Sequence, residues 1–243
     1  MRYCLFILVV FNSFISFGQA SKPDTFSVVN GDKILIPFER KYIQYTETKE
    51  GLISFNSILT RKLEKVQVEG RDNWLIIQSY QSNKSIDKDS SFCELTTLKP
   101  VAYFSDVASE GHKEKVTFLK NSISNKTLYK DSSATIIKEN TGRYNGVMSD
   151  EIISCLPLKL NASFAIKTVN PGLRYFEYTT DVTVEGKEEI EIAGLGKILC
   201  WKLRTGKGRN SSLEWYSVNG QVQVKKKFEF GNGSVFYRVL LAG

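Results

Sequence analysis

The 243-residue sequence is poor in the residues that build metal sites and activated nucleophiles. It contains one histidine, four cysteines and five prolines. A conventional zinc site needs closely spaced pairs of nitrogen or sulfur ligands, and the single His112 with scattered cysteines does not supply them. The sequence also lacks a G-x-S-x-G element and a glycine-rich phosphate loop that opens a helix. We therefore expect no metal, no cofactor and no catalytic residues.

Two features could still suggest catalysis, and each has a simpler interpretation. His112 lies in a turn-like sequence and is expected to be an exposed loop histidine. Four glutamates cluster within residues 185–191, whereas a glycosidase needs two carboxylates that face a sugar across a cleft. Glu189 and Glu191 alternate with isoleucines, which is typical of a strand with one face in water. A hydrolase is therefore the least favoured hypothesis.

Long apolar runs are confined to the start of the chain. Residues 1–20 combine the positive charge of Arg2 with an apolar stretch, and Gly18 and Ala20 are the small residues that a signal peptidase requires. The run is interrupted by polar residues and is too short for a spanning helix. The sequence predicts a cleaved signal peptide over 1–20, one β-rich domain over 21–243, and no transmembrane segment after cleavage.

The charge that remains after cleavage is positive and widely spread. Residues 21–243 contain 32 Lys and Arg against 26 Asp and Glu. Diffuse positive charge favours anionic lipid or glycan surfaces. Basic clusters with interleaved aromatic residues are missing, so we do not expect nucleic acid as a partner. Cys93, Cys155 and Cys200 allow at most one disulfide, and the sequence leaves its partners open.

Alternation with a period of two dominates the rest of the sequence. In residues 221–230, the pattern places Val222, Val224, Phe228 and Phe230 on one face of a half-buried strand. The dipeptide Asn219-Gly220 before it favours a two-residue hairpin turn in which both residues have positive φ. The last third of the chain is thus predicted to be an antiparallel meander.

Similar strands recur about every ten residues along the chain. They are predicted at 53–59, 63–68, 74–80, 95–104, 115–120, 126–129, 133–138, 173–185, 188–192 and 197–204. Such spacing, with Gly, Asn or Ser between strands, indicates an antiparallel sandwich, barrel or strongly curved sheet. A helix is predicted over 149–158, where Ser149 is a suitable N-cap, and 39–50 could be helix or edge strand. The predicted fold is mainly β, with one or two short helices.

Aromatic residues make up 12% of the sequence, and many lie on predicted strands. Most of them are expected to pack in the core. Neighbouring pairs such as Trp215-Tyr216 nevertheless place rings on both faces of a strand, and a sheet that is apolar on both faces must be covered on both. Few helices are predicted, so a hydrophobic guest could provide part of this cover. We predict that Trp201, Trp215, Phe228 and Phe230 line its binding site.

Two stretches resemble a family of exported Gram-negative proteins, the domain of unknown function numbered 3108. They are residues 92–100, FCELTTLKP, and 182–194, VTVEGKEEIEIAG, followed by Trp201 and the 215–217 triplet WYS. The resemblance covers about residues 50–243. That family is similar in fold to the lipoprotein carrier LolA and receptor LolB. The resemblance therefore implies a strongly curved antiparallel sheet, an incomplete β-barrel whose concave face holds lipid.

These observations support a non-enzymatic protein of the periplasm or cell envelope. The first hypothesis is that it binds a lipid or a lipoprotein acyl chain in the concavity of the curved sheet. The alternative is a structural or interaction protein whose concavity is filled by its own side chains and whose partner is another envelope protein. An open apolar concavity would favour the first hypothesis, and a filled one would favour the second.

Overall fold

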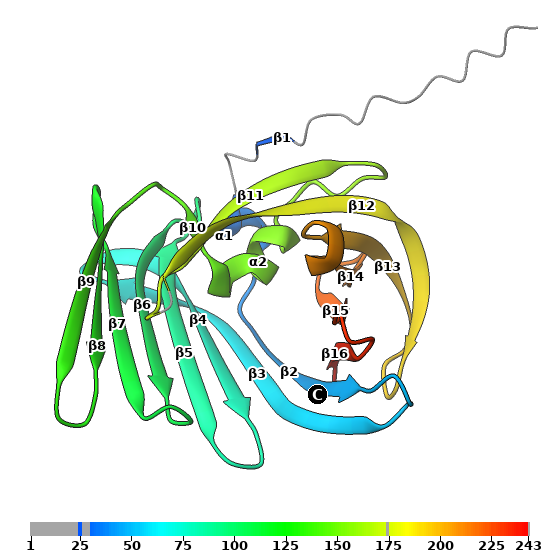
Figure 1. Cartoon of the computed structure of the whole chain (residues 1–243). Helices are drawn as coiled ribbons and strands as arrows, with labels where there is room; N and C mark the ends of the chain where they lie inside the picture. The colour runs from blue at the N-terminus through cyan, green and yellow to red at the C-terminus, as the bar shows by residue number, and fades with distance from the viewer. Residues whose placement is uncertain (1–23, 26–29, 174, 243) are drawn as a thin grey trace, which may run out of the picture.

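The computed structural model describes residues 24–25, 30–173 and 175–242 of the chain. The signal peptide predicted over 1–20 lies outside these residues. Sixteen strands form one sheet, in the order β1-β11-β12-β13-β14-β15-β16-β2-β3-β4-β5-β6-β7-β8-β9, with β10 beside β11. Figure 1 shows that the sheet bends strongly around α2 and continues on one side as an arm from β4 to β9.

The strands of the first half run from the N-terminal segment to the middle of the chain. They are β1 (Asp24–Thr25), β2 (Phe38–Glu47), β3 (Ile53–Val68), β4 (Arg71–Gln81), β5 (Ile86–Glu94), β6 (Pro100–Val107), β7 (His112–Phe118), β8 (Ser122–Leu128), β9 (Ser133–Glu139) and β10 (Tyr144–Asn145). The short helix α1 (Gly31–Ile34) precedes β2.

The second half contains the other helical turns and the remaining strands. They are η1 (Gly146–Met148), α2 (Ser149–Ser154), β11 (Ser163–Asn170), β12 (Phe176–Ile192), β13 (Gly196–Thr205), η2 (Gly208–Asn210), β14 (Ser212–Ser217), β15 (Gln223–Glu229) and β16 (Val235–Leu240). The pairings are antiparallel except those of β1 and β10 with β11. The mainly β prediction of a curved antiparallel sheet with short helices is confirmed.

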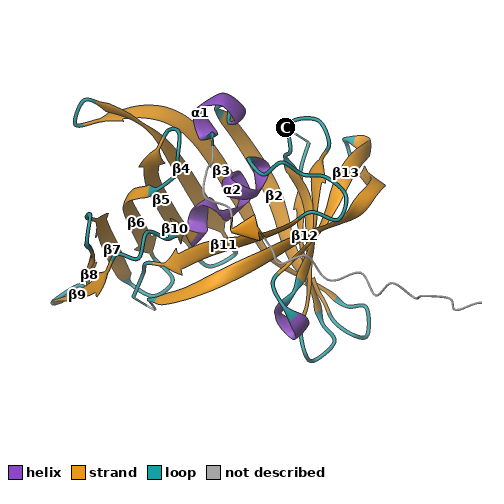
Figure 2. Ribbon diagram, turned by 90° about the horizontal axis from the view of Figure 1, so that it is seen from above, coloured by secondary structure: helices purple, strands orange, loops and turns teal. Residues whose placement is uncertain are grey.

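Helix α2 packs inside the bend of the sheet and forms the centre of the main hydrophobic core. In Figures 1 and 2 it lies between β11–β12 and the strands β2–β4. Ile152 and Ile153 are buried against Phe164, Val182 and Leu203 of the surrounding strands. Burial of such side chains stabilises the fold by about 1.5–3 kcal/mol each. The helix therefore covers the apolar part of the concave face.

A second hydrophobic cluster lies on the opposite face of β13–β15. Cys200, Trp215 and Val224 are buried there with Ile192. Cross-strand partners share a face, and successive residues of a strand face opposite sides. Trp201 pairs with Tyr216, which belongs to the core around α2, and Trp215 pairs with Lys202. The aromatic neighbours along these strands thus do cover both faces of the sheet.

Several predicted elements differ from the observed ones. The two strands predicted within 53–68 are one strand, β3, and those predicted within 173–192 are one strand, β12, with a bulge between Val184 and Gly186. Residues 39–47 of the ambiguous segment 39–50 belong to β2, which pairs with β16 and β3 and is not an edge strand, and residues 48–50 lie in the turn that follows. Strands β5 and β11 were not predicted, because SIDKDSSFC and SFAIKTVN alternate too weakly.

The meander of β14 and β15 contains two departures from the sequence pattern. The positive φ values in the turn belong to Gly220 and Gln221, so the prediction for Asn219 was wrong. The pairing also shifts at Trp215/Tyr216, where β15 has an extra residue, Val224. A bulge reverses the alternation of side chains. Val224 therefore packs beside Trp215, whereas Phe228 pairs with Ser212 on the α2 side of the sheet.

Candidate functional site

The concave face beside α2 holds a network of buried charges. Arg61 of β3 is 4% exposed, and its Nη2 lies 2.6 Å from Glu151 Oε2, while its Nη1 lies 3.4 Å from Asp150 Oδ2. Arg238 of β16 donates to Asp150 Oδ2 over 2.7 Å. Lys226 lies 2.9 Å from Glu214. The two carboxylates at the start of α2 therefore bind the helix to β3 and β16, the strands on either side of β2.

The charges in this network shift one another's ionisation. Burial alone would raise the pKa of Asp150, but the guanidiniums of Arg238 and Arg61 lower it to about 2. Burial likewise opposes the charge on Glu214, and Lys226 brings its pKa below the usual value. Burial alone would lower the pKa of Arg61, whereas Glu151 and Asp150 raise it. Asp150, Glu214 and Arg61 are therefore charged at neutral pH.

The space that α2 leaves open on the concave face combines charged and polar groups with apolar ones. A cavity of about 390 Å³ is lined by Arg238, Lys226, Glu214 and Thr205, together with Tyr178 and other residues. A neighbouring cavity of about 310 Å³ shares Tyr80 and Asn170 with it and is lined by carboxylates. Unpaired polar groups lose hydration when an acyl chain covers them. This cleft is therefore poorly suited to a purely apolar ligand.

His112 lies in the second of these cavities. It is the first residue of β7 and is 7% exposed, so the prediction of an exposed loop histidine was wrong. Its Nε2 is 3.6 Å from Glu114 and its Nδ1 is 3.8 Å from Glu110. Glu114 also accepts a hydrogen bond from the backbone N–H of Leu173, which secures the β11–β12 loop over the cleft. Among the described residues, no cluster of His, Cys, Asp and Glu is suited to hold a metal ion.

An apolar groove lies on the opposite face of the sheet, near the tip of the β12–β13 hairpin. It has a volume of about 770 Å³, and its walls are mostly aliphatic: Leu195, Ile198, Val222, Val224, Leu240, Leu241 and Ala242. Leu195 is 39% exposed at its rim. Glu39, Arg40 and Lys41 of β2, together with Ser217, provide its polar lining. The groove thus combines a long apolar surface with a charged border.

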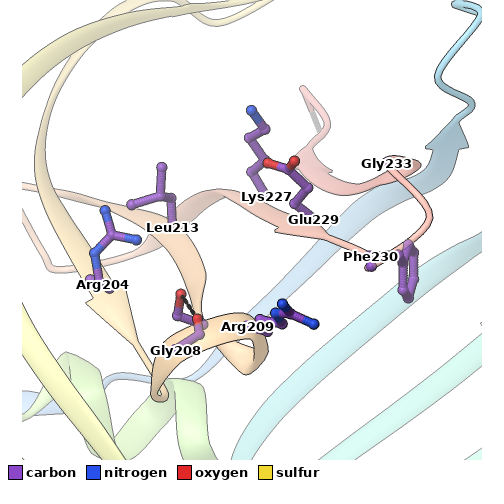
Figure 3. A pocket seen from close by; sticks show the side chains of 10 residues that line it. Arg204, Gly208, Arg209, Leu213, Lys227, Glu229, Phe230 and Gly233 are labelled. Carbon is purple, nitrogen blue, oxygen red and sulfur yellow. Dashed lines mark hydrogen bonds between the residues drawn. The ribbon is translucent and has the colours of Figure 1, made fainter.

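A third hollow, the basic recess, lies at the other end of β13–β15 and has a volume of about 390 Å³. Arg204, Leu213 and Lys227 share one face by their pairing. Arg209 extends from η2 toward the side of Phe230 (Figure 3). Glu229 and Phe230 complete its wall. The recess is therefore mixed in character, with three cations, one carboxylate and apolar surface.

The four predicted lining residues do not share one cavity. Trp201 is partly buried against the core around α2, with Lys187 Nζ 4.4 Å from the centre of its ring. Trp215 is buried on the opposite face, where its Nε1 donates to Glu188 over 3.2 Å. Phe228 and Phe230 do meet, with ring centres 5.0 Å apart, and Phe230 lines the basic recess. The alternation of side chains along β13 and β14 could have shown that Trp201 and Trp215 lie on opposite faces of the sheet. The bulge at Val224, which changes the face on which Phe228 lies, could not be located from the sequence.

The remaining candidate groups lie apart from these hollows. Glu189 is 3.2 Å from Lys197 on an exposed part of the β12–β13 hairpin, as its alternating sequence predicts. Cys93, Cys155 and Cys200 are all buried and free. Burial raises the pKa of each thiol, that of Cys155 to about 12 and that of Cys200 to about 11. All three thiols are therefore protonated at neutral pH and make poor nucleophiles.

Comparison with known proteins identifies a family but no activity. Within the described residues, no helix has the length and apolarity needed to cross a membrane. No curated protein matches the chain. The model of one protein family matches residues 24–240, which include all the strands of the sheet. The chain belongs to the family described as protein of unknown function (DUF3108).

Proposed function

We propose that this chain is a non-enzymatic, exported protein of the cell envelope that binds a lipid or acyl chain in the apolar groove. The observation that carries the proposal is the volume of about 770 Å³ between mostly aliphatic side chains. Binding sites for small ligands are about 300–1,000 Å³ in volume and predominantly apolar. Arg40 and Lys41 at the border suit a ligand with an anionic head group.

This location differs from the concavity expected from the resemblance to LolA and LolB. Helix α2 and the charges of Asp150, Glu151 and Arg61 take up the concave face. On the opposite face, the groove is continuous with the cluster of Trp215 and Val224, because Val224 belongs to both. Trp215 thus supports one end of the groove, whereas Trp201, Phe228 and Phe230 lie elsewhere. The predicted signal peptide supports export to the periplasm.

Displacement of a fluorescent fatty acid by unlabelled fatty acids of increasing length tests the proposal. Each buried methylene contributes about 0.8 kcal/mol, so two more should strengthen binding roughly tenfold until the groove is full. Leu195→Asp should abolish displacement, and Lys41→Gln should weaken it for acids but not for alcohols of equal length. Leu119→Asp, at a leucine of the β7–β8 turn that is 53% exposed against 39% for Leu195, is the control. Binding that is independent of chain length would contradict the proposal.

A structural or interaction protein is the second candidate, and the position of α2 favours it. Ile152, Ile153 and Leu156 fill the apolar part of the concave face with the chain's own side chains. Such a protein would act through its surface and would need no small ligand. Cross-linking in cells of its natural source should then recover one envelope protein reproducibly. Failure to recover any partner, together with fatty acid binding that Leu195→Asp removes, would decide against this candidate.

A further inference from the structure

The basic recess contains cations that lack an acidic partner. Arg204 Nε donates to Glu185 over 2.6 Å. In the described part of the chain, neither Arg209 nor Lys227 forms an ion pair, and Glu229 is the only carboxylate among the residues that line the recess. Arg209 is exposed and Lys227 is half-buried, and neighbouring cations without a counter-charge favour the binding of an anion. The lining of the recess thus carries an excess of positive charge.

The same recess offers an apolar wall beside these cations. Leu213 lies between Arg204 and Lys227 in the pairing of β13, β14 and β15. Phe230 is 42% exposed, and its ring is held edge-on by Phe228 at an interplanar angle of 81°. Figure 3 shows Arg209 extending from η2 toward the side of Phe230. An anion attached to an apolar body would satisfy both parts of this surface.

The turn that carries Arg209 is structurally constrained. Gly206 has a φ of +86°, and a Cβ at this position would lie 2.4 Å from the carbonyl oxygen of Asn210. Ser211 Oγ donates to the carbonyl oxygen of Gly208 over 2.8 Å. A turn held in this way loses little conformational entropy when a ligand binds. The turn therefore holds the backbone of Arg209 at the edge of the recess.

We infer that the basic recess binds a phosphate group carried on an apolar body. Guanidinium groups match the geometry of phosphate oxygens, and an ammonium group adds a second charge-assisted hydrogen bond. Arg209 and Lys227 contact the phosphate, while Phe230 and Leu213 contact its substituent. The phosphate belongs either to a lipid head group at a membrane surface or to a soluble phosphorylated molecule. This site is separate from the apolar groove, and the inference does not rest on the proposed function.

Two binding measurements on the purified chain test the inference and distinguish the sources of phosphate. One titrates phenyl phosphate and inorganic phosphate by calorimetry. The other measures co-sedimentation with phosphatidylcholine vesicles that contain or lack phosphatidylglycerol. The double variant R209Q/K227Q should weaken binding by about tenfold or more. R71Q/K120Q removes the same charge from two exposed positions of the other half, the first residue of β4 and the β7–β8 turn, and should bind like the unmodified chain.

Each outcome has a defined meaning. Loss of phenyl phosphate binding in R209Q/K227Q alone assigns the recess to soluble phosphorylated ligands. Loss of vesicle binding alone in that variant assigns it to a lipid phosphate. Phe230→Ala should weaken binding of phenyl phosphate and leave inorganic phosphate unchanged. Equal losses in the two double variants, or no binding to either probe, would overturn the inference.

Discussion

Arg61 lies with its guanidinium between the carboxylates of Asp150 and Glu151 and also donates to the side-chain oxygen of Gln78. Transfer of such charges out of water costs several kcal/mol per ion, and mutual attraction offsets this only when the geometry is good. Removal of one partner leaves the others buried without compensation. The network therefore makes the position of α2 depend on one side chain of β3.

We expect Arg61→Ala to lower the free energy of unfolding by about 3–5 kcal/mol, because buried Glu151 would lose the guanidinium that pairs with it and Asp150 would lose one of its two arginine partners. Urea denaturation followed by tryptophan fluorescence measures this change. Lys62→Ala removes the neighbouring cation, which is exposed and paired with Glu64, and should change stability by about 1 kcal/mol or less. Equal effects of the two substitutions would show that the buried network contributes little.

The lowered pKa of Asp150 predicts how the free energy of unfolding depends on pH. A carboxyl group whose pKa is lower in the folded state contributes stability above its unfolded pKa and loses it as the pH falls through the folded value. For Asp150 this window extends from about 4 to about 2. Stability should therefore fall steeply over this range, and Asp150→Asn should flatten the decline while lowering stability at pH 7. Denaturant midpoints measured at each pH test this, and an unchanged slope in the variant would refute it.

At the scale of elements, the β13–β14 turn shows how one glycine positions a site. Gly206 is left-handed and lies against the backbone of Asn210, whereas a Cβ at Gly186 would meet open space and its φ is not positive. We expect Gly206→Ala to destabilise the protein by about 1–3 kcal/mol and to displace Arg209 from the basic recess. Gly186→Ala should be nearly neutral. Thermal unfolding of both variants measures the difference, and equal melting temperatures would contradict it.

The elements themselves could be predicted to different degrees. Strands β13 to β16 alternate clearly, so their existence and antiparallel order followed from the sequence. Strand β5 could not be recognised, because DKDSS places polar residues on both faces of the strand. In the structure, Asp89 of this strand accepts hydrogen bonds from the hydroxyl groups of Tyr103 and Ser105. Those donors belong to β6. A strand whose polar side chains are stabilised by hydrogen bonds from a neighbouring strand cannot be recognised from its own sequence pattern.

At the scale of the whole molecule, β16 joins the two halves of the sheet. It pairs with β15 on one side and with β2 on the other, so the end of the chain meets a strand formed by residues 38–47. Strand pairing between distant parts of the sequence forms slowly, and it stabilises the sheet only when both strands are present. Strand β16 also supplies Arg238 to the network around α2. The strand therefore contributes both to the pairing of the sheet and to the network of buried charges around α2.

We expect a chain that ends at Gly231 to fail to fold, because β15 and β2 would both expose unpaired edges and Asp150 would lose Arg238. Circular dichroism, hydrogen exchange and solubility measure this outcome. A full-length chain with Asn232→Ala, in the turn before β16, is the control and should fold normally. A truncated chain with the same melting temperature as the full chain would show that the two halves do not depend on β16.

The sequence alone determined the class of structure, because alternation and turn residues act over a few neighbouring positions. One example is β12, where alternation places Val182 and Val184 on the same face and glycines lie in the turn that follows. Patterns of this kind along the chain predict a sheet with little helix. What lies against each face of the sheet depends on contacts between distant parts of the chain. The burial of Glu151 depends on Arg61, ninety residues away, and the bulge at Val224 depends on its pairing with β14. Helix α2 thus covers the concave face through contacts that no local pattern contains.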